Sequence, residues 1–190
     1  MSRTSSNTIE EAHGQSPKRR RDARCSPFAS PKLHSSQALR CHASLVAFGN
    51  VTDYGTNLQF VQHVLAMDTI FPTSAIRYRA ITNPMLQQAA YLLIIATEAA
   101  VAVLCWLGAY RLLRVFRADG CAFNRAKTIS IVGLTLGILL WQVAFMTIAG
   151  EWFGMSMSEQ WNGVPDAFRL VMILYASLIF LVVRDDDLRP

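Results

Sequence analysis

The chain has 190 residues, of which 52% are hydrophobic and 16% charged, whereas an average soluble domain has roughly 25% charged residues. This composition excludes a disordered or low-complexity chain and argues against a soluble nucleic-acid-binding protein. The net charge of +5 belongs to residues 1–40, which hold eight Lys and Arg against three Asp and Glu; the remaining residues hold ten of each kind. The basic character therefore describes a tail, and the rest has the composition of a membrane protein.

The first 43 residues are predicted to form a disordered, basic and Ser-rich tail. The basic run at 18–21 would also suit a nuclear-localisation or lipid-binding cluster. Glu10 and Glu11 argue against a transit peptide. A twin-arginine or lipoprotein signal would need an apolar stretch after the arginines or before Cys25, and neither is present.

Three apolar runs are predicted to cross a membrane. Residues 89–110 carry one charge, Glu98, and as a helix would be about 33 Å long, enough for a hydrocarbon core of about 30 Å. Residues 128–150 carry no charge. The third run, 165–183, qualifies because proline suits the first turn of a helix and Arg169 can extend its charge to the interface. A soluble helical bundle is the alternative, but these runs are apolar on all sides.

The placement of Lys and Arg predicts the orientation of these spans. The connection 111–127 contains five such residues and should be cytoplasmic, whereas the connection 151–166 contains none and should lie outside. The tail 184–190 then returns to the cytoplasm, and residues 49–85 form an outer segment. The apolar positions of residues 58–66 predict a short helix within that segment.

Several stretches of uncommon residues follow a pattern that resembles a known family. They read FGNVTDYGTN at 48–57, FVQHVLAMDT at 60–69 and GEWF at 150–153, with shorter pieces at 71–72, 79–82, 161–163 and 167–169. The pattern is similar to a bacterial family of predicted small integral membrane proteins, the domain of unknown function 2165. The resemblance covers roughly residues 44–183. It implies four transmembrane helices in the bacterial inner membrane, with both chain ends in the cytoplasm, and it implies no activity.

The front end departs from the family pattern. Members begin with an apolar helix that leads into the stretch 50–54, whereas here only 43–48 of that helix is recognisable, and six residues cannot span a membrane. We therefore predict a three-span version of a four-span fold, in which a helix over about 37–48 forms without crossing. The abrupt change suggests a shifted reading frame or a wrongly placed start. A second departure, Ser156-Met157 where members often have Trp-Gln, weakens the idea of a fixed recognition surface in that loop.

Glu98 is the strongest candidate for a functional group. A carboxylate within a span costs about 2.5–3.5 kcal/mol on insertion scales, so it normally faces the interior of a bundle or water. At helical spacing it shares a face with Gln87, Tyr91, Ala102 and Cys105. The functional hypothesis is a proton- or cation-handling site. The preferred interpretation is a protonated or hydrogen-bonded carboxyl that joins helices.

A second intramembrane feature is the G-x-x-x-G element of Gly133 and Gly137. Small residues at this spacing let two helices approach closely. We predict that the element packs within the monomer and does not form a dimer face.

Ionisable residues of the outer segment and loop are possible metal or proton ligands. Their spacing matches no metal signature, so a hydrogen-bonded cap is the preferred interpretation. Arg169 is predicted to pair with Glu151, which lies at the outer end of the preceding span, because Glu98 lies too deep for it. The candidates are Asp53, His63, Asp68, Glu151 and Arg169.

These observations predict an all-α membrane protein, a small helical bundle organised as a tail (1–43), a membrane domain (44–183) and a short cytoplasmic tail (184–190). We expect no enzyme, metal or cofactor, and four unpaired cysteines, because no C-x-x-C pair occurs. The expected partners are the lipid bilayer and other membrane proteins, not nucleic acid. The expected role is structural or accessory, as a subunit of a membrane assembly. The alternatives are a minor proton or cation transporter built around Glu98, or a membrane redox or metal-binding component.

Overall fold

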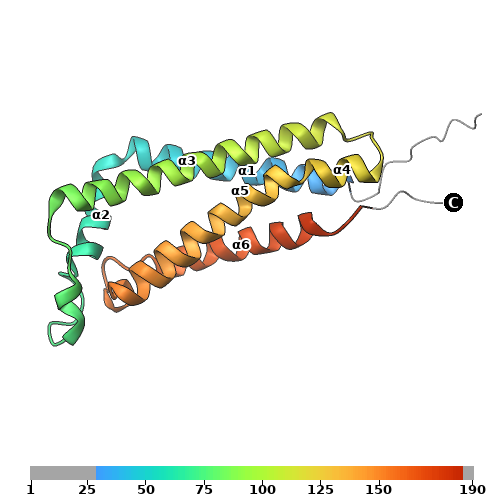
Figure 1. Cartoon of the computed structure of the whole chain (residues 1–190). Helices are drawn as coiled ribbons and strands as arrows, with labels where there is room; N and C mark the ends of the chain where they lie inside the picture. Colours follow the sequence, from blue (N-terminus) through green and yellow to red (C-terminus); the bar gives the residue numbers. More distant parts are fainter. Residues whose placement is uncertain (1–28, 186–190) are drawn as a thin grey trace, which may run out of the picture.

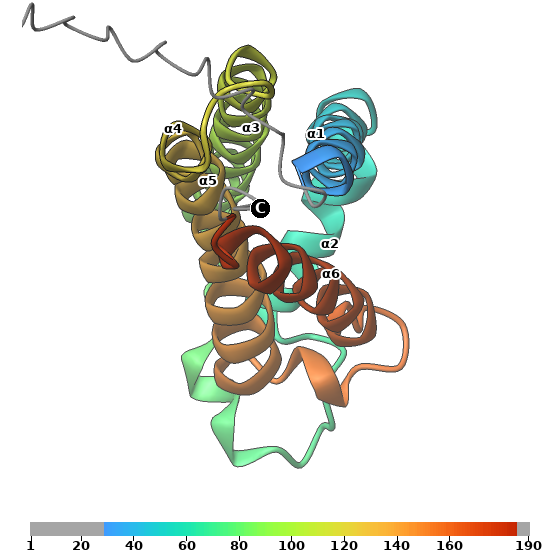
Figure 2. The same cartoon turned by 90° about the vertical axis from the view of Figure 1, so that its right-hand side faces the viewer.

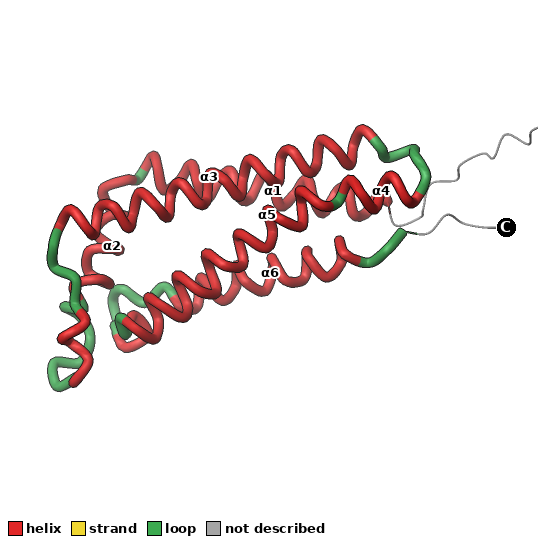
Figure 3. Tube along the Cα trace, viewed as in Figure 1, coloured by secondary structure: helices red, strands yellow, loops and turns green. Residues whose placement is uncertain are grey.

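The computed structural model describes residues 29–185, with side chains from residue 41 onward. Over that range the chain consists of helices and short connections, without a strand (Figure 3). The prediction of an all-α membrane bundle is confirmed. The predicted disorder of residues 1–43 is wrong for residues 29–43, which belong to a helix, and residues 1–28 lie outside the described residues. The elements are α1 (Ala29–Thr52), α2 (Tyr54–Ala66), η1 (Ala75–Arg79), α3 (Pro84–Arg114), α4 (Gly120–Ala126), α5 (Thr128–Ile138), η2 (Leu139–Trp152), η3 (Met155–Met157) and α6 (Val164–Val182).

Three helices of the described chain are long and apolar enough to cross a membrane, which confirms the three predicted spans. They are α3, the continuous helical run Gly120–Trp152 and α6. Helix α3 is longer than predicted because its start is well capped. The side chain of Asn83 accepts a hydrogen bond from the backbone N–H of Met85 at 2.9 Å, and Pro84 occupies the first turn.

The long helices lie side by side along one axis. In Figure 1, α4 and the end of α6 lie at one end of the molecule, and α2 and the connection after it lie at the other. Figure 2, turned by 90°, shows α1, α3, α5 and α6 arranged around the bundle axis. Helix α3 is central because it packs against α1 on one side and α5 on another, whereas α1 touches α6 only sparsely.

The predicted length of the helix near the N-terminus is wrong. The sequence predicted a helix over about 37–48, but α1 runs from Ala29 to Thr52 and lies along α3. Its 24 residues give a length of about 36 Å, comparable with a membrane core. Lys32, Arg40 and two histidines interrupt its apolar character, but none of these side chains prevents an α-helix. Because of its charges and low hydropathy, the full helix was not predicted from the sequence. By composition, α1 is not among the helices apolar enough to span a membrane.

The second predicted span changes its backbone form midway. Residues 128–150 were expected to be one regular helix, but α5 continues as the π-helix η2. The hydroxyl of Thr147 donates to the carbonyl of Gln142, and the N–H of Phe153 donates to the carbonyl of Ile148, both five residues back. Long π-helices are rare, and hydrophobic periodicity carries no signal for them.

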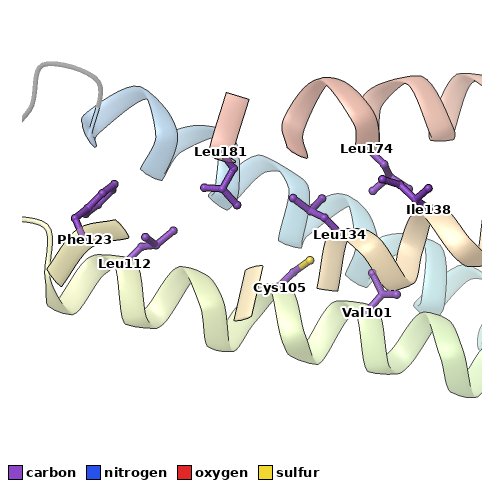
Figure 4. Packing of buried hydrophobic residues seen from close by; sticks show 8 residues of the cluster. All are labelled: Val101, Cys105, Leu112, Phe123, Leu134, Ile138, Leu174 and Leu181. Carbon is purple, nitrogen blue, oxygen red and sulfur yellow. The ribbon is translucent and has the colours of Figure 1, made fainter. Parts of the chain in front are cut away.

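Buried side chains form two clusters. The larger one joins α3, α4, α5 and α6, and Figure 4 shows its residues projecting between these helices. The smaller one lies under the outer segment and contains Val64, Met67, Ile70, Phe153 and Met155. The predicted short helix, observed as α2, therefore packs on a core of its own. The outer segment is a folded cap on the bundle.

The orientation of the bundle can be tested with cysteines. Cys121 is exposed in α4, within the connection predicted to be cytoplasmic. In a variant whose other cysteines are replaced by serine, a membrane-impermeant maleimide should label Cys121 in inverted vesicles but not in intact cells. The matched variant carries its single cysteine at position 151 (Glu151→Cys), which is exposed in the predicted outer loop, and should show the reverse. Labelling of Cys121 in intact cells would contradict the orientation.

Candidate functional site

Glu98 lies inside the bundle and is bonded to a different helix. Its side chain is 3% exposed. The amide Nδ2 of Asn50, near the end of α1, donates to its Oε2 at 2.6 Å. The hydroxyl of Tyr91 donates to the backbone carbonyl of Asn50 at 2.7 Å, so the same residue is held from two points on α3. The carboxyl thus joins α1 to α3, as the preferred interpretation predicted.

The inward-facing stripe predicted for α3 is confirmed by burial. Gln87, Tyr91, Ala102 and Cys105 are all at most 9% exposed. Gln87 donates to the carbonyl of Ile81 at 2.8 Å and so closes the connection before α3. The sequence did not single out Asn50 as a partner, because it was assigned to the outer segment. A buried carboxylate needs a hydrogen-bond donor. That requirement was the signal in the sequence that Glu98 has a polar partner.

The second carboxylate oxygen of Glu98 is unpartnered among the described residues, and Glu98 also lines a cavity. Oε1 is buried and has no hydrogen-bond partner among the described residues. Glu98 is one of the residues lining a cavity of about 30 Å³, room for one or two water-sized groups. The lining comes from α1, α3, the α5–η2 run and α6, and is otherwise almost entirely apolar. It includes Val46, Val101, Cys105, Leu140, Trp141 and Leu174.

Of the candidate residues predicted in the outer segment and loop, only His63 and Asp68 lie in contact with each other. The Nδ1 of His63 lies 2.7 Å from Oδ2 of Asp68, and the imidazole stacks on Trp161 at 4.6 Å between ring centroids. Asp53 and Glu151 are exposed and do not join this pair. Among the described residues no three His, Cys, Asp or Glu side chains are placed to hold a metal ion. His63 and Asp68 belong to a hydrogen-bonded cap, the preferred interpretation.

The predicted pairing of Arg169 with Glu151 is wrong. Arg169 pairs with Asp166, one turn earlier on α6, and both side chains are about 70% exposed. A partner three residues away on the same helix is reached without bridging the loop, which explains the preference. Arg169 does not reach Glu98, in agreement with the predicted depth of the two residues.

The G-x-x-x-G element packs within the monomer, as predicted. A Cβ atom on Gly133 would lie 2.9 Å from Cβ of Leu104, and one on Gly137 would lie 3.3 Å from Cδ1 of Leu174. The closest approach involves Gly108, which the sequence analysis missed. A Cβ there would overlap Oγ of Ser130 and lie 2.7 Å from its backbone nitrogen. Helices α3 and α5 therefore meet almost backbone to backbone.

The end of the bundle at α4 contains a buried ion pair that the sequence analysis also missed. Nζ of Lys127 lies 2.5 Å from Oδ2 of Asp185, and the two side chains are 3% and 0% exposed. Lys127 also donates to the side chain of Asn124 and the carbonyl of Val183, both at 2.7 Å. Asn124 in turn exchanges hydrogen bonds with the backbone of Asp185. These contacts, the inner clasp, fix the end of α6 to the start of α5.

The fold and these contacts define the class of protein. It is a small all-α integral membrane protein in which a buried carboxyl group is hydrogen-bonded between two helices. Residues 32–184 match the family described as predicted small integral membrane protein, domain of unknown function 2165, so the chain belongs to that family. The match begins at residue 32, twelve residues before the resemblance noted from the sequence, and thus includes most of α1. A comparison with curated proteins and one with solved structures each found no match.

Proposed function

We propose that this protein is a non-enzymatic structural or accessory component of a bacterial inner-membrane assembly. The observation that supports the proposal is the use made of its buried polar groups. Asn50 and Glu98 join α1 to α3 within the bundle, and Lys127 and Asp185 join α5 to the end of α6. Such bonds hold helices in place, which suits a scaffold that presents a fixed apolar surface to lipid and to other membrane proteins.

The side of α6 that points away from the bundle is one surface available to such a partner. Phe168, Met172, Ile173, Ile179 and Val182 are each between 48% and 64% exposed on this helix. In a bilayer, lipid tails cover such residues as well as another helix does, so association depends on packing and hydrogen bonding. The proposal therefore needs a direct test of partners.

Purification of the tagged full chain in mild detergent provides that test. We expect one or more membrane proteins to co-purify in stoichiometric amounts, and the Glu98→Gln variant, which retains the side-chain volume, to keep them. Migration of the wild-type chain alone, in detergent and after crosslinking in membranes, would contradict the accessory role.

A second candidate is a proton or cation pathway around Glu98. The observation that favours it is the buried Oε1 without a partner among the described side chains. Proteoliposomes loaded with a pH-sensitive dye distinguish the candidates. A pathway gives proton flux that Glu98→Gln abolishes, whereas an accessory protein gives no flux with either chain.

A further inference from the structure

The lining of the cavity beside Glu98 includes exposed residues of both α1 and α6. Two of its lining residues, His42 on α1 and Ile173 on α6, are exposed, and Ile173 is 49% exposed. These two helices pack against each other only sparsely. On α3 the lining residues extend from Glu98 to Cys105, about 10 Å at the rise of an α-helix. The cavity therefore has a mostly apolar wall, one carboxyl group among its described lining residues, and exposed lining residues on α1 and α6 that form its mouth.

We propose that this pocket binds a single-chain lipophilic amine, with its nitrogen at Oε1 of Glu98 and its hydrocarbon chain leaving through the mouth between α1 and α6. The cavity of about 30 Å³ accommodates a group of the size of water, as an amino group is. The apolar lining and the bordering lipid suit an alkyl chain. Among the described residues, Glu98 is the one carboxylate that lines the pocket, and it supplies the charge complementarity.

The charge balance favours an amine over a permanently charged cation. A neutral amine crosses hydrocarbon easily, whereas an isolated ion in the membrane interior is expensive. Proton transfer from a neutral carboxyl group to the amine gives an ammonium and a carboxylate in contact, with no net charge added to the membrane. Asn50 already donates to Oε2, so Oε1 is the oxygen left for the ammonium. Charge-assisted bonds of this kind are about twice as strong as neutral ones.

Other ligand classes fit the pocket less well. His42, Glu98 and Cys105 all line it, but they are not placed as three ligands of a metal ion. An acidic amphiphile would bring a second carboxyl or phosphate beside Glu98. The proposal is independent of the accessory role, because an assembly subunit and an isolated protein could both contain the pocket.

The test is equilibrium binding of radiolabelled decylamine to the full chain in lipid nanodiscs, with empty nanodiscs measuring simple partition. We expect saturable binding to the wild type that Glu98→Gln weakens by about tenfold or more, the loss expected for one charge-assisted hydrogen bond. Decanol, of similar length but without the basic nitrogen, should show no dependence on Glu98. Equal decylamine binding by wild type and Glu98→Gln would overturn the proposal. Equal dependence of decanol on Glu98 would overturn the assignment to amines.

A second pair of variants keeps the test decisive if Glu98→Gln does not fold. Ile173→Trp should fill the mouth and weaken decylamine binding while Glu98 stays in place. Ile179→Trp is the matched control, because Ile179 is exposed on the same helix but does not line the pocket. Its binding should equal that of the wild type. If the two tryptophan variants bind decylamine equally, the mouth is not where the chain leaves and the proposal fails.

Discussion

Replacing Lys127 with methionine is expected to lower the free energy of unfolding by about 3–5 kcal/mol. The substitution removes the ammonium group that lies 2.5 Å from Oδ2 of Asp185, whose side chain is 0% exposed. It also removes the donor to Asn124 and to the carbonyl of Val183. A buried ion pair adds little net stability because of desolvation, but removing one partner leaves the full penalty of the other.

Thermal or denaturant unfolding in detergent micelles measures this effect. The control is Arg125→Met, two residues earlier, because Arg125 is exposed and its loss should change stability by no more than about 0.5 kcal/mol. Asp185→Asn should also destabilise, and the double variant should lose less than the sum of the single losses, since the residues share one interaction. Equal stability of Lys127→Met and Arg125→Met would show that the inner clasp is absent in the membrane protein.

Replacing Gly108 with alanine is expected to lower the free energy of unfolding by about 1–3 kcal/mol, the usual range for overpacking. The added Cβ would overlap Oγ of Ser130 and lie 2.7 Å and 2.9 Å from its backbone N and Cα. A side chain could rotate away, but the backbone atoms can give way only if α3 and α5 separate. Separation loses the close packing that holds helices together in lipid.

Gly49→Ala provides the matched control for Gly108→Ala. Gly49 is also a helical glycine, but a Cβ there would meet nothing within 4 Å. Alanine is favoured over glycine within a helix by roughly 0.5–1 kcal/mol, so this variant should be as stable as the wild type or slightly more so. Unfolding curves that coincide for the two variants would contradict the close approach of α3 and α5.

The sequence predicted those parts of the structure that depend on length and hydropathy. The three spans are readable because each carries enough apolar residues in a row, and the inward stripe of α3 follows from helical spacing around Glu98. The small residues Gly133 and Gly137 point to close packing for the same local reason. None of these predictions needs knowledge of which helices are neighbours.

The missed features all depend on contacts between residues distant in the chain. Asn50 and Glu98 are 48 residues apart, and Asn124 and Asp185 are 61 apart. Lys127 was counted only as a loop charge, although its ammonium group is buried. Gly108 carries no motif of its own, because its partner surface at Ser130 belongs to another helix. Such pairings follow from the tertiary arrangement, which a single sequence does not show.

The composition of α1 has a consequence for the order in which the bundle assembles. Helix α1 is synthesised before α3, yet it is not among the described helices that are apolar enough to cross a membrane. Helix insertion and helix association are separable stages in membrane protein folding. Since α1 packs chiefly on α3 and its end is bonded to Glu98, it gains its partner only after α3 has been made and inserted. We therefore expect α1 to pack into the bundle later than its place in the sequence suggests, with the carboxyl group of Glu98 on α3 as its bonding partner.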